Sequence, residues 1–115
     1  VFQLTHQSTV LENNLPNDPT ERELWVYLPP SYETSQKRYP VLWMLPAFGG
    51  GPSGLVSGTP WSPSIPRQMD ILIQKGMNEA IVVFPDAFTR FGGSQYINSS
   101  ALGRYEDYIR RLRRI

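Results

Sequence analysis

The sequence contains no cysteine, and this absence excludes disulfide bonds, thiol nucleophiles and thiolate metal sites without identifying the compartment. It holds a single histidine, His6, too few imidazoles for a typical zinc site. No apolar run approaches the roughly 18 residues that a membrane-spanning helix needs. The net charge of +1 creates no field across the whole chain that would attract nucleic acid or a membrane. We therefore expect no metal site, no nucleic-acid partner and no membrane partner.

Neither length nor composition indicates disorder or a second domain. The chain has 115 residues, of which 40% are hydrophobic and 18% are charged. A domain of this size buries roughly 60–70% of the surface that its unfolded form exposes. We therefore expect residues 1–115 to belong to one domain with a modest core.

The clearest strand pattern covers residues 22–28. Leu24 and Val26 lie on one face of the alternation, and Trp25 and Tyr27 lie on the other. Two prolines follow and end the segment. The alternation predicts a strand with apolar side chains on both faces.

Two short runs, Val41–Leu45 (VLWML) and Ala80–Phe84 (AIVVF), contain no polar residue. Pro40, Pro46 and Pro85 bound them too closely for a helix. Runs of this kind are typical of strands that helices cover on both faces of a parallel sheet. We therefore predict two buried parallel strands.

Helical patterns occupy two segments. Residues 66–76 begin with Pro66 and end with Gly76, which suit the first turn and the C-terminal cap, and Ile65, Met69, Leu72 and Ile73 share a face. A second helix is predicted from about Ala101 to the end, capped by Ser99 or Ser100. Its predicted apolar face comprises Leu102, Tyr105, Tyr108, Ile109, Leu112 and Ile115.

With a weaker strand over residues 2–12, the predicted order is β-β-β-α-β-α, which indicates an α/β fold. Residues 49–66 are predicted to be a long loop rich in proline and glycine. The last helix is expected to lead into another strand, and none follows in this sequence. The predicted sheet is therefore partial and incomplete at the C-terminus.

Several short motifs follow one another in a specific order and spacing. They are residues 26–32 (VYLPPSY), 39–42 (YPVL), 45–50 (LPAFGG), 83–86 (VFPD), 92–99 (GGSQYINS) and 103–108 (GRYEDY). In this order the chain resembles the N-terminal portion of an esterase family of α/β-hydrolases that includes feruloyl esterases, S-formylglutathione hydrolase, enterochelin esterases and mycolyl-transferase antigens. The resemblance covers roughly residues 8–109, and the basic end of the chain departs from the family.

The resemblance implies a serine esterase or acyl hydrolase that takes a small-molecule ester and needs no cofactor. It implies that the backbone N–H of Phe48 is one oxyanion donor, and that Trp61 and Tyr96 line the substrate site. Ala47 departs from the His-Gly-x pattern that is common at this position. In such families the nucleophilic Ser, the acid and the His follow later, so the chain is expected to lack all three and to be inactive alone.

Within these residues the candidates for a nucleophile and a base are weak. Ser53 and Ser94 lie in sequences that lack the closing glycine of a G-x-S-x-G elbow. His6 lies early in the first predicted strand, where a structural role is expected. Asp86 follows a predicted strand and is expected to orient a loop by accepting backbone N–H groups.

Two other functional hypotheses remain. The chain is alternatively a small non-catalytic module that binds ligands with the same loops. A weaker alternative is a nucleotide-binding domain, because residues 49–54 (GGGPSG) match G-x-G-x-x-G and Asp70 lies about twenty residues on. Pro52 removes one N–H from that loop, and the prolines that follow disfavour the helix that the motif requires.

Two further sequence patterns lie near the end of the chain. Asn98-Ser99-Ser100 matches the acceptor pattern for N-glycosylation, which is short and occurs often by chance. The four arginines of residues 110–114 are interpreted as a solvated helix face.

Overall fold

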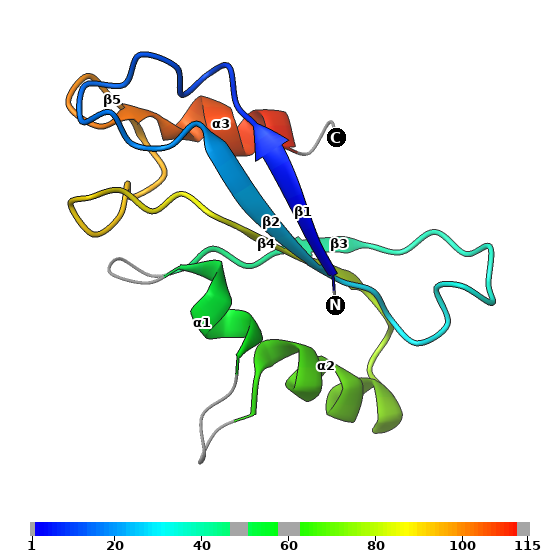
Figure 1. The fold of residues 1–115 in the computed structure, drawn as a ribbon. Helices are drawn as coiled ribbons and strands as arrows, with labels where there is room; N and C mark the ends of the chain where they lie inside the picture. The colour runs from blue at the N-terminus through cyan, green and yellow to red at the C-terminus, as the bar shows by residue number, and fades with distance from the viewer. Residues whose placement is uncertain (1, 47–50, 58–62, 113–115) are drawn as a thin grey trace.

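The structure is a computed structural model that describes residues 2–46, 51–57 and 63–112. Its centre is a four-stranded mixed sheet in the order β1-β2-β4-β3 (Figure 1). The strands are β1 (Phe2–Gln7), β2 (Glu21–Tyr27), β3 (Val41–Trp43) and β4 (Ile81–Pro85). β2 pairs antiparallel with β1 and with β4, whereas β3 and β4 are parallel.

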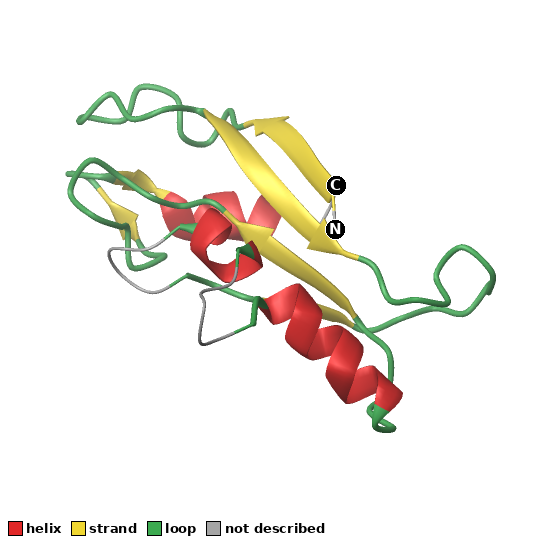
Figure 2. Ribbon diagram, turned by 60° about the horizontal axis from the view of Figure 1, so that its bottom comes forward, coloured by secondary structure: helices red, strands yellow, loops and turns green. Residues whose placement is uncertain are grey.

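Helices cover both faces of this sheet (Figure 2). The crossover between the parallel strands contains α1 (Pro52–Val56) and α2 (Ile65–Gln74). α3 (Tyr105–Leu112) packs on the opposite face and follows a small hairpin of β5 (Asn98–Ser99) and β6 (Gly103–Arg104). A mixed sheet with these helices is compatible with a partial α/β fold. Within the described residues, no helix has both the length and the hydropathy that crossing a membrane would require.

The alternation predicted for residues 22–28 is confirmed by two separate clusters of buried side chains. Leu24 on β2 and Val83 on β4 pack with the buried residues of α3. Tyr27 and Phe84, on the opposite face of the same strands, pack with Met69 of α2. Because successive strand residues point to opposite faces, one pair of strands contributes to both cores.

The prediction that both apolar runs are covered on both faces is right for β4 and wrong for β3. Four of the five residues of β4 are buried. By contrast, Val41, Leu42 and Leu45 are 46%, 48% and 42% exposed. The reason is position, because β3 is the edge strand of the described sheet and has a neighbour only on its β4 side.

The last helix begins at Tyr105 and not near Ala101, so the prediction was wrong for residues 101–104. These residues belong to the β5–β6 hairpin, in which Gly103 has a φ of 138°, outside the helical region. The predicted caps Ser99 and Ser100 were also wrong. The Oδ1 atom of Asn98 accepts a hydrogen bond from the Asp107 backbone N–H at 3.2 Å, within the first turn of α3.

The helix predicted over residues 66–76 is confirmed as α2, with small differences at its ends. Ser64 caps it by accepting a hydrogen bond from the Arg67 N–H at 3.3 Å, and Gly76 follows it with a φ of 107°. Leu72 was expected on the buried face and is 45% exposed. The five-residue helix α1 was not predicted, because Gly54 and the flanking prolines favoured a loop.

Buried tyrosines make the stability of this fold sensitive to alkaline pH. Burial raises the pKa of Tyr108, and burial together with a hydrogen bond to Asp70 raises the pKa of Tyr27. A phenol of this kind ionises first in the unfolded chain, so its contribution to stability is complete below about pH 10 and is lost as the pH rises through its folded-state pKa. We expect the free energy of unfolding to fall by up to about 1.4 kcal/mol per pH unit for each such tyrosine.

Urea unfolding at about pH 8 and about pH 11 measures this loss. Tyr108→Phe is expected to reduce the difference between the free energies of unfolding at the two pH values. An equal pH dependence in the wild type and in the Tyr108→Phe variant would contradict the assignment.

Candidate active-site edge

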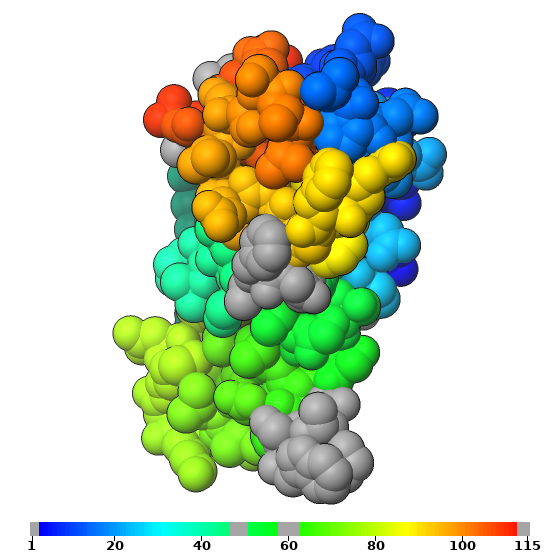
Figure 3. Space-filling model, turned by 90° about the vertical axis from the view of Figure 1, so that its left-hand side faces the viewer, coloured from blue at the N-terminus to red at the C-terminus, as the bar shows by residue number. Residues whose placement is uncertain are grey.

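The carboxyl ends of β3 and β4 meet at one edge of the sheet, because these two strands are parallel. Pro46 follows β3 and Asp86 follows β4 at this edge. Figure 3 views the molecule from this side: the segment after β4 (yellow) lies between the β5–β6 and α3 segments (orange) and α1 (green). Ligands of open α/β sheets bind outside the carboxyl ends of the strands, so this edge is the candidate site.

Tyr96, one of the predicted site residues, lies at this edge. Its hydroxyl donates a hydrogen bond to the carbonyl oxygen of Pro46, fifty residues earlier in the chain. Burial, together with the nearby Asp86 carboxylate, raises the pKa of Tyr96. The tyrosine therefore joins the loops that follow two different strands, while its contact with a substrate stays a prediction. Phe48 and Trp61, the other two predicted site residues, lie outside the described residues.

The turn that carries Tyr96 has an unusual backbone conformation. Gln95 and Tyr96 have φ values of 54° and 59°, and Gly92 and Gly93 also have positive φ. A left-handed conformation of a residue other than glycine costs on the order of 1 kcal/mol, and such residues cluster at functional sites. The Oγ atom of Ser94 accepts a hydrogen bond from the Tyr96 N–H at 3.3 Å and so helps to hold the turn.

Thr89 stabilises the same segment from beneath. Its side chain is 1% exposed, and its hydroxyl donates a hydrogen bond to the carbonyl oxygen of Gly93 at 2.6 Å. The same Oγ1 atom accepts hydrogen bonds from the N–H groups of Phe91 and Gly93. One buried hydroxyl therefore joins residues 89, 91 and 93 of the loop that follows β4. The sequence analysis did not identify this residue.

Arg22 is the other residue that the sequence analysis missed. It is 3% exposed, and its Nη1 atom lies 3.4 Å from the Asp86 carboxylate. The same Nη1 atom donates a hydrogen bond to the Phe88 carbonyl oxygen at 2.6 Å, while Nε donates to the Pro19 carbonyl oxygen and Nη2 to Tyr105 Oη. The alternation of β2 could have identified this residue, because Arg22 lies on the same strand face as the buried Leu24. An arginine that is buried there requires hydrogen-bonding or charged partners.

Asp86 acts as the sequence predicted, since its Oδ1 atom accepts a hydrogen bond from the Phe88 backbone N–H at 3.0 Å. Its other carboxylate oxygen faces Arg22. Because both oxygens are engaged within the chain, Asp86 is a structural group that shapes the loop after β4.

The described residues do not form a nucleophile and base pair. Ser94 is 3% exposed, whereas Ser53 is exposed on α1. His6 lies on β1 with its ring centroid 6.5 Å from that of Tyr108, and it hydrogen-bonds to none of the described serines. The described part of the chain also contains no group of acidic and histidine side chains that could hold a metal ion. This edge can therefore position loops, but its described residues cannot activate a serine.

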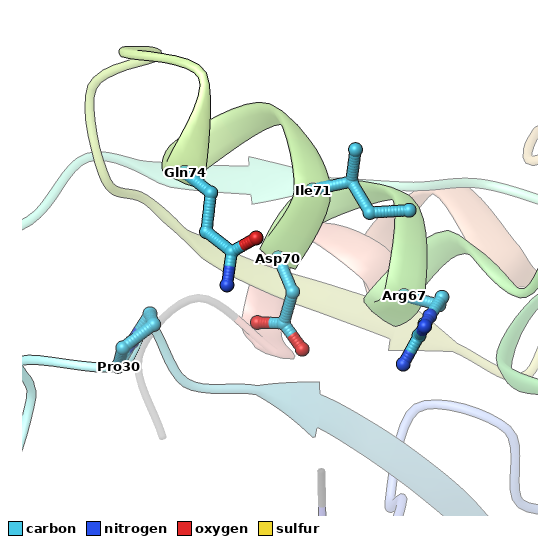
Figure 4. A pocket seen from close by; sticks show the side chains of 5 residues that line it. All are labelled: Pro30, Arg67, Asp70, Ile71 and Gln74. Atoms are coloured by element: carbon cyan, nitrogen blue, oxygen red, sulfur yellow. The ribbon is translucent and has the colours of Figure 1, made fainter.

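A recess lies between α2 and the turn after β2. It has a volume of about 350 Å³ and is lined by Pro30, Arg67, Asp70, Ile71 and Gln74 (Figure 4). Asp70 accepts a hydrogen bond from the Tyr27 hydroxyl at 2.6 Å. The acidic residue of the nucleotide-binding alternative is thus bonded to a core tyrosine. In addition, α1 has only five residues and begins at Pro52, which has no N–H for a phosphate.

Comparison with known proteins shows a likeness to a solved structure. No protein-family model matches the chain, and no curated protein matches it. Among solved structures, a ferulic acid esterase superposes with a TM-score of 0.71 and 26% sequence identity. The overlap covers 94% of this chain and 39% of that esterase chain, so this chain spans well under half the length of the protein that it matches. The arrangement of these residues is therefore similar to part of an esterase.

Proposed function

We propose that residues 1–115 form the N-terminal part of one α/β-hydrolase domain of a serine esterase. The observation that carries this proposal is the superposition of nearly the whole chain on part of a ferulic acid esterase. The parallel strands β3 and β4, which a helical crossover connects, support the same assignment. So does the hydrogen bond of Tyr96 to Pro46, which joins the loops at the carboxyl ends of these strands. The substrate class is then a small-molecule ester, and an ester of an aromatic acid is the first choice to test.

Acyl transfer requires a nucleophile, a base and hydrogen-bond donors for the developing oxyanion. In the proposed enzyme this chain supplies one hydrogen-bond donor for the oxyanion. That donor is the backbone N–H of Phe48, two residues after Pro46. Tyr96 and Trp61 form walls of the substrate site. The serine, the acid and the histidine come from a part of the domain that has no counterpart in these residues.

A chimera tests this proposal directly. The segment of the ferulic acid esterase that superposes on this chain is replaced by this chain, and hydrolysis of methyl ferulate is measured. We expect turnover that is abolished when the nucleophilic serine in the esterase portion is changed to alanine. This chain alone is expected to hydrolyse p-nitrophenyl acetate no faster than the same chain unfolded in urea.

Two results would contradict the proposal. One is a chimera that unfolds cooperatively and has the circular dichroism of an α/β domain, but hydrolyses neither methyl ferulate nor p-nitrophenyl acetate. The other is turnover by this chain alone that Ser53→Ala or Ser94→Ala abolishes, which would place the nucleophile inside it. Binding of ferulate to the isolated chain, without turnover in the chimera, would favour the alternative of a non-catalytic binding module.

A further inference from the structure

Asn98 is the only asparagine in the sequence that is followed by the pattern x-Ser or x-Thr. It lies in β5, on the small hairpin that leads into α3 and forms part of the surface in Figure 3 (orange). Both Asn98 and Ser100, the two residues that define the pattern, are exposed. The fold therefore presents this acceptor pattern at the surface and not in the core.

The hydrogen bonds of Asn98 leave its amide nitrogen available. Oδ1 accepts the Asp107 backbone N–H, which is the contact that caps α3. Nδ2 makes one hydrogen bond, a long one of 3.4 Å to the Asp107 carboxylate. Since a side-chain amide carries two N–H bonds, one of them is not used in this contact. A substituent on Nδ2 is thus compatible with the capping role of Oδ1.

The surroundings of the hairpin also have room for a polar group. A recess of about 330 Å³ lies between the hairpin and the loop that follows β1. Its lining includes Asn13, Ser100 and Arg104, whose amide, hydroxyl and guanidinium groups are suitable partners for sugar hydroxyls.

From these observations we infer that Asn98 is an acceptor for an N-linked glycan. An oligosaccharyltransferase would move the glycan from a polyprenyl-diphosphate donor. A bond forms between Nδ2 and the anomeric carbon, the bond from that carbon to the diphosphate oxygen breaks, and the amide loses one proton. This inference is independent of the proposed esterase function, because it uses only the hairpin.

The test is expression of the whole chain behind a secretory leader in a yeast, with total cell material analysed by gel mobility and mass spectrometry. The wild type is expected to carry one glycan, seen as a single mass step that peptide N-glycosidase F removes. Asn98→Asp and Ser100→Ala are expected to abolish the step, and Ser100→Thr to retain it. Ser100→Ala leaves Asn98 and its hydrogen bond to the Asp107 N–H in place, so loss of the glycan in that variant is not caused by loss of the cap.

A matched control distinguishes a poor acceptor from failed delivery to the compartment. Glu33→Asn, combined with Ser100→Ala, creates a sequon with Ser35 on the exposed loop after β2 and removes the natural one. If this control is glycosylated and the wild type is not, the inference is overturned. It is also overturned if the glycosylated wild type is found only as an unfolded or aggregated species, whereas the enzymatically deglycosylated chain unfolds cooperatively.

Discussion

Arg22→Met is expected to lower the free energy of unfolding by about 3–5 kcal/mol, because it removes one partner of a buried ion pair. Asp86 would lose its cationic neighbour, and Tyr105 would lose the guanidinium that bonds its hydroxyl and lies 5.6 Å from its ring centroid. The Pro19 and Phe88 carbonyl oxygens would also lose their donor. Urea unfolding followed by circular dichroism measures the change.

Arg104→Met is the matched control, because it removes an arginine of comparable size from an exposed ion pair. The Nη2 atom of Arg104 lies 2.6 Å from the Oδ2 atom of Asp107, but the arginine side chain is 60% exposed. We expect this variant to lose less than about 1 kcal/mol. Equal losses in the two variants would show that burial of Arg22 does not determine the strength of its contacts. The double variant Arg22→Met, Asp86→Asn is expected to be less destabilised than the sum of the two single variants.

Tyr96→Phe is expected to reduce kcat of the chimeric esterase by about 10- to 100-fold, with little change in KM. This expectation rests on the proposed function. The lost hydroxyl holds the carbonyl oxygen of Pro46, and Pro46 begins the segment that carries the proposed donor Phe48. A donor displaced by a fraction of an ångström stabilises the transition state less than before, while the ground-state complex changes little.

Tyr32→Phe is the control for this substitution, because its ring is 44% exposed and lies on the loop after β2. It is expected to leave kcat and KM unchanged. An unchanged kcat in Tyr96→Phe, in a chimera that hydrolyses methyl ferulate, would contradict the positioning role and leave the esterase assignment intact. A fall in kcat with a rise in KM and a lower unfolding midpoint would instead indicate a general loss of structure.

Much of the fold could be predicted because it depends on patterns of neighbouring residues in the sequence. The alternation around Leu24 and Tyr27 predicted which side chains enter which core, and the structure confirms it. Pro66 and Gly76 predicted the position of α2 to within two residues. One failure was also local. The β5–β6 hairpin interrupts an apolar pattern that otherwise suits a helix, since Gly103 adopts a φ that a helix does not allow.

The candidate site was less accessible to prediction because its organising contacts are distant in sequence. Arg22 bonds to residues 66 and 83 positions later, and Tyr96 bonds to a residue 50 positions earlier. Parity alone indicated that Arg22 faced the core. Nothing in the neighbouring residues indicated which carboxylate or carbonyl oxygen would accept its hydrogen bonds.

The amino-acid order was sufficient to predict the faces of β2, the burial of β4, and the position of α2 from Pro66 and Gly76. Each of these depends on side-chain periodicity or on backbone sterics within a few residues. Only the assembled chain decided that β4 inserts between β2 and β3, that β3 is left with exposed apolar residues, and that Tyr96 meets Pro46. These features depend on which distant segments pack together, and that choice is made by the burial and hydrogen bonding of the whole molecule.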